Sequence, residues 1–316
     1  MAIVPSSSCS KAAMRGRRDR KLLSGLLRLT LKPLFSSGTP IWLQRRALNM
    51  AHVITRVPDG VSFTDETLNG VTGECVQSAA TASRTVAILY LHGGGYCVGA
   101  PRLYRAITAQ LAITAGVPVH VPGYRLAPEH PWPAALNDVV AAYRALLESG
   151  VTRIVLAGDS AGGGLALAAA LALREAGLTA PKALVLLSPW VKLGSWRDMQ
   201  AAQEKRDPML SRDGLRRWAT AYCDRVPQSH PLCSPLLADL RGLPPTLIQG
   251  GSEELLIDDL LQLERKLHGA GVLAQLQIEP DLWHVYQLHA GVLAEADLAL
   301  AKIGRFLTGL QLQGNR

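Results

Sequence analysis

The residues with the clearest chemical potential lie in two short motifs, each directly after an apolar run. His92–Tyr96 (HGGGY) follows Val86–Leu91, and Gly158–Gly162 (GDSAG) follows the run Ile154–Ala157. A glycine run after a strand can turn backbone N–H groups toward a developing negative charge, and a serine between two glycines can occupy a sharp strand-to-helix turn with its hydroxyl exposed. The first motif therefore predicts an oxyanion hole, and the second predicts a nucleophile, Ser160.

A serine hydroxyl needs a base, usually a histidine that a carboxylate orients. Where the nucleophile lies on such a turn, the acid follows it along the chain and the histidine comes last. His284 follows the last apolar run, Ala274–Ile278, whereas His268 lies inside a predicted helix and His289 in the last helical segment. We therefore predict His284 as the base. Four other histidines are interpreted as structural or surface residues: His52, His120, His130 and His230.

The acid is expected in the loop after the apolar run Thr246–Gln249, where four carboxylates compete. Asp258 and Asp259 fall in the first turn of a predicted helix, where an acid commonly stabilises the helix dipole. Glu253 and Glu254 remain as the two loop candidates.

The chain resembles the hormone-sensitive-lipase-like family of α/β hydrolases, known in bacteria as family IV esterases. The likeness runs from Pro58 to Leu307. The segments that carry it are His92–Tyr96, Tyr124–His130, Gly158–Gly162, Asp207–Ser211, Gly242–Pro245 and Trp283–His284. The resemblance implies an α/β-hydrolase fold and hydrolysis of carboxylic esters through an acyl-enzyme, with no metal or organic cofactor.

The family resemblance also implies individual roles. The acid of that family heads the pattern Asp/Glu-x-Leu-x-Asp-Asp/Glu, which Glu254–Asp259 fits in register, so the resemblance favours Glu254 over Glu253. The implied oxyanion donors are the backbone N–H groups of Gly94, Gly95 and Ala161, while His92 shapes the loop without transferring a proton. The supporting motif positions are His92, Gly93, Tyr96 and Asp159.

Two residues depart from the family pattern. Cys97 stands where many relatives have an aliphatic residue. A small buried hydrophobic side chain is the favoured interpretation, and sensitivity to thiol reagents is the alternative. Trp283 is bulky beside the base and is expected to narrow the substrate pocket.

The elements that must position these residues are short apolar runs separated by segments with helical spacing. Such alternation predicts a mostly parallel eight-stranded sheet with helices on both faces. The first strand pair is expected at His52–Val57 and Val71–Val76, around a turn at Pro58–Gly60. The remaining strands are expected at Val86–Leu91, Val117–Val121, Arg153–Ala157, Ala183–Leu187, Thr246–Gln249 and Ala274–Ile278.

The interval after the sixth strand is too long for one crossover. We predict a helical cap insertion at 190–230, a basic N-terminal cap segment at 1–50, and a catalytic core at 51–189 and 231–316. The first dozen residues, which are rich in serine, are expected to be disordered.

The net charge of +8 is concentrated in residues 1–50, the N-terminal leader. Residues 1–50 carry ten basic side chains against Asp19 alone, so the rest of the chain is nearly neutral and gives no nucleic-acid signal. The leucines of Leu22–Leu31 form a mostly one-sided stripe that suits a helix, either packed on the protein itself or lying on a membrane surface.

The favoured function is a cytoplasmic serine carboxylesterase that acts on short to medium acyl esters. The alternatives are a lactonase or amidase with the same triad, or an interfacial lipase that contacts membranes through the leader. A noncatalytic ligand receptor is disfavoured because all three triad members are present. The resemblance also suggests a homodimer through the last strand and helix.

Overall fold

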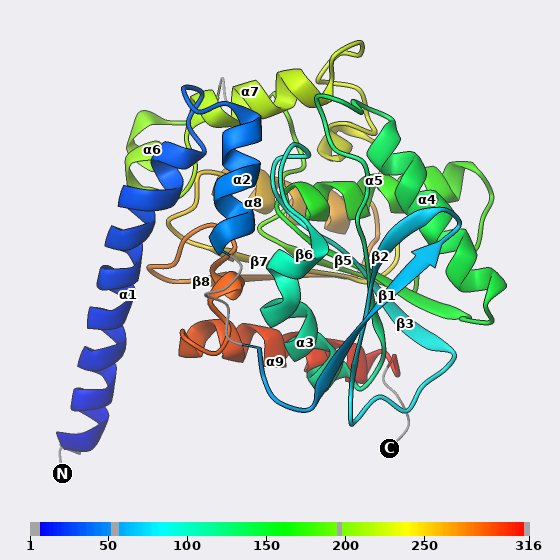
Figure 1. Cartoon of the computed structure of the whole chain (residues 1–316), viewed down its shortest axis with the longest axis horizontal. Coiled ribbons are helices and arrows are strands. Elements are labelled where there is room, and N and C mark those ends of the chain that lie inside the picture. The colour runs from blue at the N-terminus through cyan, green and yellow to red at the C-terminus, as the bar shows by residue number, and fades with distance from the viewer. Residues whose placement is uncertain (1–6, 52–56, 195–197, 313–316) are drawn as a thin grey trace.

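The computed structural model describes residues 7–51, 57–194 and 198–312, and a single sheet with helices on both faces forms its centre (Figure 1). The strands are β1 (Val61–Leu68), β2 (Val71–Ser78), β3 (Val86–Leu91), β4 (Val119–Pro122), β5 (Arg153–Asp159), β6 (Ala183–Leu187), β7 (Thr246–Gly251) and β8 (Ala274–Glu279). They lie in the order β1-β2-β4-β3-β5-β6-β7-β8. The pairs β1/β2 and β2/β4 are antiparallel, and every pair from β4 to β8 is parallel. The predicted eight-stranded, mostly parallel sheet is confirmed.

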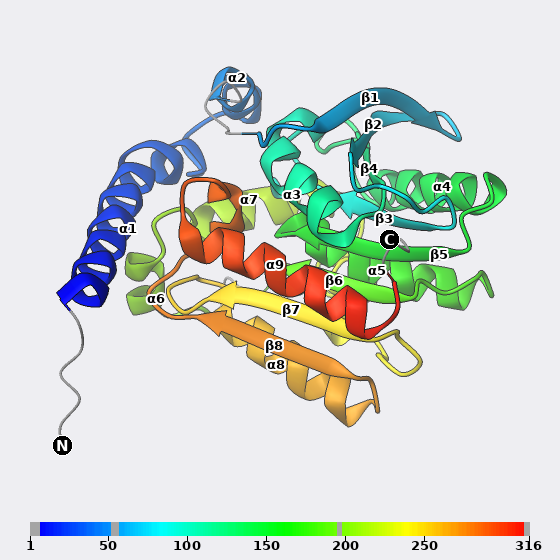
Figure 2. The ribbon, with the colours of Figure 1, turned by 90° about the horizontal axis from the view of Figure 1, so that it is seen from below.

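Helices cover both faces of this sheet, and further helices lie beyond the ends of its strands (Figure 2). They are α1 (Ser7–Leu34), α2 (Ile41–Ala51), α3 (Arg105–Ala115), α4 (Ala134–Glu148), α5 (Ala161–Glu175), α6 (Ala201–Arg206), α7 (Arg212–Tyr222), α8 (Ile257–Gly269) and α9 (Ala294–Gly309). Alternate strand residues face opposite layers: Ile88 and Val155 pack with α3 and α9, whereas Leu89 and Leu156 pack with α4, α5 and α8. Because both faces are covered, β3 and β6 are apolar throughout.

The first hairpin differs from the prediction. β1 and β2 pair from Val61 with Ser78 to Leu68 with Val71, so the turn is Asn69-Gly70 rather than Pro58–Gly60. Both turn residues have positive φ, 46° at Asn69 and 84° at Gly70, which is the two-residue hairpin geometry that Asn-Gly favours. The predicted strand at His52–Val57 is wrong at Val57, which precedes β1, and residues 52–56 lie outside the described residues.

The leader packs beside the insertion that follows the sixth strand. α6 and α7 lie in the connection between β6 and β7, as the sequence predicts, and α1 and α2 lie next to them (Figure 1). The disorder expected for the first dozen residues is wrong from Ser7 onward, where α1 begins; residues 1–6 lie outside the described residues. Across the described ranges, none of the helices combines the length and hydrophobicity needed to span a bilayer.

Candidate active site

Ser160 occupies a strained turn between β5 and α5. Its φ of 52° and ψ of −121° are rare for a residue with a side chain. The flanking glycines permit this turn, because a Cβ on Gly158 would lie 2.5 Å from the Gly162 backbone and a Cβ on Gly162 would lie 2.0 Å from the Leu91 carbonyl oxygen. The Ser160 N–H donates to the Leu187 carbonyl at 2.8 Å, which fixes the turn to the neighbouring strand β6.

Three side chains from different loops meet at this turn. Ser160 Oγ lies 2.9 Å from His284 Nε2, and His284 Nδ1 lies 2.9 Å from Glu254 Oε2. Since a carboxylate accepts, Nδ1–H donates to Glu254 and Nε2 is left to accept the serine proton. The structure therefore brings together the three residues expected to be nucleophile, base and acid.

The two loop acids differ in where their side chains lie. Glu254 is fully buried, and its second oxygen accepts from the Gly251 N–H at 2.9 Å. Burial raises the pKa of Glu254, and the hydrogen bond from His284 opposes this rise. Glu253 instead lies at the surface in a two-pronged ion pair with Arg206, which lowers the pKa of Glu253. Asp258 and Asp259 lie in the first turn of α8, as predicted.

The other two late histidines do not reach Ser160. His268 lies within α8, as predicted, and its Nε2 hydrogen-bonds the Ala274 carbonyl. His289 ends a short 3-10 turn, Tyr286–His289, before α9 begins at Ala294, so its predicted place in the last helix is wrong. The chain turns there because Val285 adopts the left-handed conformation and Ala290 is extended.

The glycine loop after β3 has a backbone that requires glycine. Gly94 and Gly95 have φ of 112° and 60°, and a Cβ on Gly94 would lie 2.1 Å from the Val98 carbonyl oxygen. Among the described residues, no hydrogen bond uses the N–H of Gly94 or Gly95. Ala161 is the first residue of α5, where a backbone N–H has no partner within its own helix. These three groups are available as donors at the turn.

Asp159 and His92 hold the glycine loop in place. Asp159 Oδ1 accepts from the Gly93 N–H at 2.9 Å and from the Tyr90 hydroxyl at 2.8 Å. His92 stacks on Tyr124 at 4.3 Å, and its Nδ1 donates to the Gly93 carbonyl at 2.8 Å. Burial lowers the pKa of His92 to about 4, so this imidazole is neutral near pH 7. A neutral, fully buried ring agrees with a shaping role.

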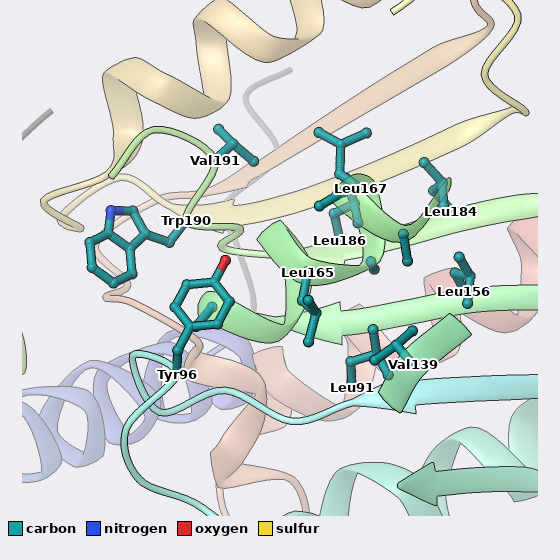
Figure 3. Packing of buried hydrophobic residues seen from close by; sticks show 14 of the residues in the cluster. Leu91, Tyr96, Val139, Leu156, Leu165, Leu167, Leu184, Leu186, Trp190 and Val191 are labelled. Carbon is teal, nitrogen blue, oxygen red and sulfur yellow. The ribbon is translucent and has the colours of Figure 1, made fainter. Parts of the chain in front are cut away.

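Aromatic side chains from the insertion cover the glycine loop. The Tyr96 ring stacks on Tyr222 of α7 at 3.8 Å and lies 6.1 Å from Trp190, beside the apolar cluster under α5 (Figure 3). Trp218 of α7 lies so close to Gly95 that a Cβ there would be 2.4 Å from its ring. Trp283, predicted to narrow the pocket, is itself buried beside His284.

Cys97 is enclosed rather than reactive. The side chain is fully buried, and burial raises the pKa of its thiol to about 12. A thiol that stays protonated is a weak nucleophile. The structure therefore supports the favoured interpretation of Cys97 as a small buried residue over sensitivity to thiol reagents.

Two residues that support the site, Asp207 and Ser188, were not predicted from the sequence. Asp207 is fully buried; its Oδ2 accepts from the Leu255 N–H at 2.8 Å, and its Oδ1 accepts from Met209 and Leu210. Ser188 Oγ accepts from the Val285 N–H at 3.0 Å, next to His284. Asp207 is the first residue of one of the segments that carry the family resemblance, and this position could have marked it as functional. No pattern in the sequence marks Ser188.

Comparisons with known proteins agree with this geometry. A family model described as alpha/beta hydrolase fold matches residues 88–288. A crystal structure of an esterase from the bacterial hormone-sensitive lipase family superposes with a TM-score of 0.85 at 36% identity, covering 100% of both chains. The chain belongs to the hormone-sensitive-lipase-like esterases of the α/β-hydrolase fold.

Curated relatives of this esterase are hydrolases by name. An acetyl-hydrolase of Streptomyces hygroscopicus is 44% identical over 76% of this chain and 81% of its own length. An esterase of Acinetobacter venetianus is 37% identical over 78% of this chain and 81% of its own. The enzyme class is therefore that of a carboxylesterase, as the sequence predicts.

Proposed function

We propose that this esterase hydrolyses short-chain carboxylic esters through a Ser160–His284–Glu254 triad and an acyl-enzyme intermediate. The observation that carries the proposal is the pair of 2.9 Å contacts from Ser160 to His284 and from His284 to Glu254. These contacts join residues from three separate loops, and a hydrogen-bonded line of nucleophile, base and orienting acid is what acyl transfer requires.

The proposed reaction has two halves. Ser160 Oγ attacks the ester carbonyl carbon while His284 Nε2 takes the serine proton, and Glu254 stabilises the imidazolium. The tetrahedral intermediate collapses, the C–O bond to the alcohol breaks, and His284 gives its proton to the departing oxygen. Water then attacks the acyl-enzyme with His284 again as base, which releases the acid and restores Ser160.

We assign the oxyanion to the N–H groups of Gly94, Gly95 and Ala161. Support comes from the unpartnered N–H groups of the two glycines and from the position of Ala161 at the start of α5. Donors of this kind each typically contribute about 10²- to 10³-fold in rate. Asp159 and His92 act as positioning residues because they hold the loop rather than touch the reacting atoms.

We infer that segments 1–50 and 190–230 cap the site and limit the size of the acyl group. Trp218 lies against Gly95, its indole N–H donates to Gln44 of α2 at 3.1 Å, and Phe35 meets its ring edge-on at 5.3 Å. Both segments therefore converge on one indole above the glycine loop. The relative named acetyl-hydrolase, and an ethyl acetate hydrolase of Pseudomonas putida at 34% identity, favour short acyl groups.

The test is hydrolysis of p-nitrophenyl esters of increasing acyl length by the wild type and Ser160→Ala. The wild type should prefer acetyl and butyryl esters, and Ser160→Ala should lose about 10⁴-fold or more in kcat/KM. An unchanged melting temperature in the variant separates loss of chemistry from loss of fold. Comparable turnover by wild type and variant would disprove the nucleophile assignment.

We also propose that α1 rests on membrane surfaces, which would give the esterase access to lipid esters. Leu22, Leu26 and Leu29 are 78%, 56% and 80% exposed, and their spacing places them along one side of the helix. Lys21 flanks this stripe, and the leader is strongly basic. An apolar stripe with flanking cations fits an anionic lipid surface.

Finally, we propose a homodimer through β8 and α9. Within the described residues β8 is an edge strand, with β7 on one side only. A groove runs beside it, lined by Leu273 directly before β8, by Gln275 and Gln277 of β8, and by residues of α9. Leu273 is 59% exposed, and an open edge strand with an apolar neighbour favours pairing with a second copy.

A further inference from the structure

A cluster of ligand-type side chains lies at the opposite edge of the sheet, away from the β7–β8 edge. Glu66 of β1, Cys75 of β2 and His120 of β4 share one face of the antiparallel part. Cys75 lies directly across from His120, and Glu66 lies across from Gly73, two residues before Cys75. Because side chains alternate along a strand, this register places all three on the same side.

The three side chains lie close together. The His120 Nδ1 atom lies 3.0 Å and 2.9 Å from the two carboxylate oxygens of Glu66. The side chains of His120 and Glu66 are only 12% and 17% exposed. One donor atom from each residue lies within 4.8 Å of the others, and this is the one such group of His, Cys and acidic residues in the part of the chain that the structure describes.

None of the three belongs to the proposed catalytic machinery, and their chemistry is that of a metal site. Thiolate, imidazole and carboxylate are the ligands of zinc, which takes four donors at about 2.0–2.3 Å in tetrahedral geometry. Donors at those bond lengths lie about 3.3–3.7 Å apart. The Glu66–His120 pair is slightly closer than this, and all the donor atoms lie within 4.8 Å of one another, so small side-chain movements would create the site.

We propose that Glu66, Cys75 and His120 bind a divalent transition-metal ion of the zinc type at the β1–β2–β4 edge. Water would complete the fourth position. An open groove whose lining includes Glu66 gives this side of the cluster access to solvent.

Binding would exchange protons for the ion. A metal-bound thiol is a thiolate and a metal-bound imidazole is neutral, so binding of the ion would release protons to solvent. The ion would tie the β1–β2 hairpin to β4 and stabilise the fold by mass action.

The probes are Zn²⁺ and Co²⁺ added to metal-free protein that carries no histidine tag. We expect one ion per chain, a melting temperature that rises with free Zn²⁺ and not with Mg²⁺, and the near-ultraviolet absorption typical of cobalt–thiolate bonds. Cys75→Ser should remove the absorption, and Glu66→Gln should weaken Zn²⁺ binding at least tenfold.

The matched controls are Cys223→Ser, which alters a buried thiol elsewhere, and Asp65→Asn, which alters the carboxylate on the other side of β1. Both should bind Zn²⁺ and Co²⁺ as the wild type does. The proposal is overturned if wild-type protein shows neither the thermal shift nor the cobalt–thiolate absorption, or if that absorption persists in Cys75→Ser. Because none of these readouts is catalytic, they do not depend on the proposed reaction.

Discussion

Two adjacent glutamates, Glu253 and Glu254, differ sharply in environment although the sequence makes them near equals. Glu254 points inward to His284 and the Gly251 N–H, while Glu253 points outward to Arg206. Chain order alone left both open, and only the family pattern favoured Glu254. The structure supplies the physical reason, because a buried carboxylate can orient an imidazole and stabilise its charged form whereas a surface ion pair cannot.

Substitution of each glutamate tests this difference. Glu254→Gln should lower kcat by about 10²- to 10⁴-fold, since the amide can hold His284 in the wrong tautomer and carries no charge to stabilise the imidazolium. Glu253→Gln breaks only a partly exposed ion pair, worth less than about 1 kcal/mol, and should keep nearly full activity. The measurement is kcat and KM with p-nitrophenyl acetate. The reverse ranking would reassign the acid.

The residues that support the site were harder to predict from the sequence than Ser160 and the glycine loop. The motifs predict Ser160 and the glycine loop because their chemistry depends on local spacing. Asp207 and Ser188 accept hydrogen bonds from the backbone N–H groups of Leu255 and Val285, which lie far from them in the sequence. The residues next to each in the sequence do not predict these contacts. Distant partners of this kind follow from packing, which a single sequence does not reveal.

At the scale of elements, apolar strands were predicted well and the polar hairpin was not. Val86–Leu91 and Ala183–Leu187 have the predicted bounds because buried parallel strands are continuous apolar runs. In β1, VSFTDETL, exposed polar residues separate the half-buried ones, so the strand contains no apolar run that would predict it. The Asn69-Gly70 dipeptide was the missed signal, since it favours a hairpin turn between alternating segments.

Basic residues of the leader have partners that the sequence did not predict. Arg28 donates to the carbonyls of Lys205 and Arg206, and Lys32 donates to those of Glu204 and Asp207. These carbonyls lie in or directly after α6, where cations are favoured by the helix dipole. Arg28 and Lys32 therefore hold α1 against the insertion through hydrogen bonds. Leu22, Leu26 and Leu29 stay exposed and are free to contact another surface.

The membrane proposal predicts what those leucines do. Wild-type protein should sediment with vesicles that contain phosphatidylglycerol, and a Leu22→Ser, Leu26→Ser, Leu29→Ser variant should bind them at least tenfold more weakly because it loses the apolar stripe. Hydrolysis of soluble p-nitrophenyl acetate should stay unchanged. Leu237→Ser, an exposed leucine elsewhere, is the control. Equal vesicle binding by the triple variant and the wild type would rule out this surface.

For the whole molecule, the unpaired β8 edge predicts assembly. Light scattering after gel filtration should give twice the chain mass for wild-type protein, and Leu273→Arg should give the monomer because it places a charge beside the exposed β8 edge. Leu237→Arg alters an exposed leucine away from β8 and should remain dimeric. A monomeric wild type, or a dimer that survives Leu273→Arg, would exclude this interface.

Stability in acid should depend in part on His289, a largely buried histidine outside the triad. His289 packs against Trp283 with ring centroids 5.7 Å apart, its Nε2 has no hydrogen-bond partner among the described residues, and burial lowers its pKa from 6.5 to about 4. As the pH falls from 6.5 to 4, the unfolded chain takes up a proton that the folded chain does not. Stability is therefore lost across that window, on the order of 3 kcal/mol from this residue.

His289→Gln removes this titration, so its free energy of unfolding should fall less than that of the wild type between about pH 7 and about pH 4.5. Urea unfolding at both pH values measures the difference. His130→Gln, which alters an exposed imidazole, should differ from the wild type by the same amount at each pH. If the difference between His289→Gln and the wild type were also the same at both pH values, the His289 imidazole would not be a source of acid sensitivity. The loss of stability would then come from other buried groups such as His92, whose pKa burial also lowers to about 4.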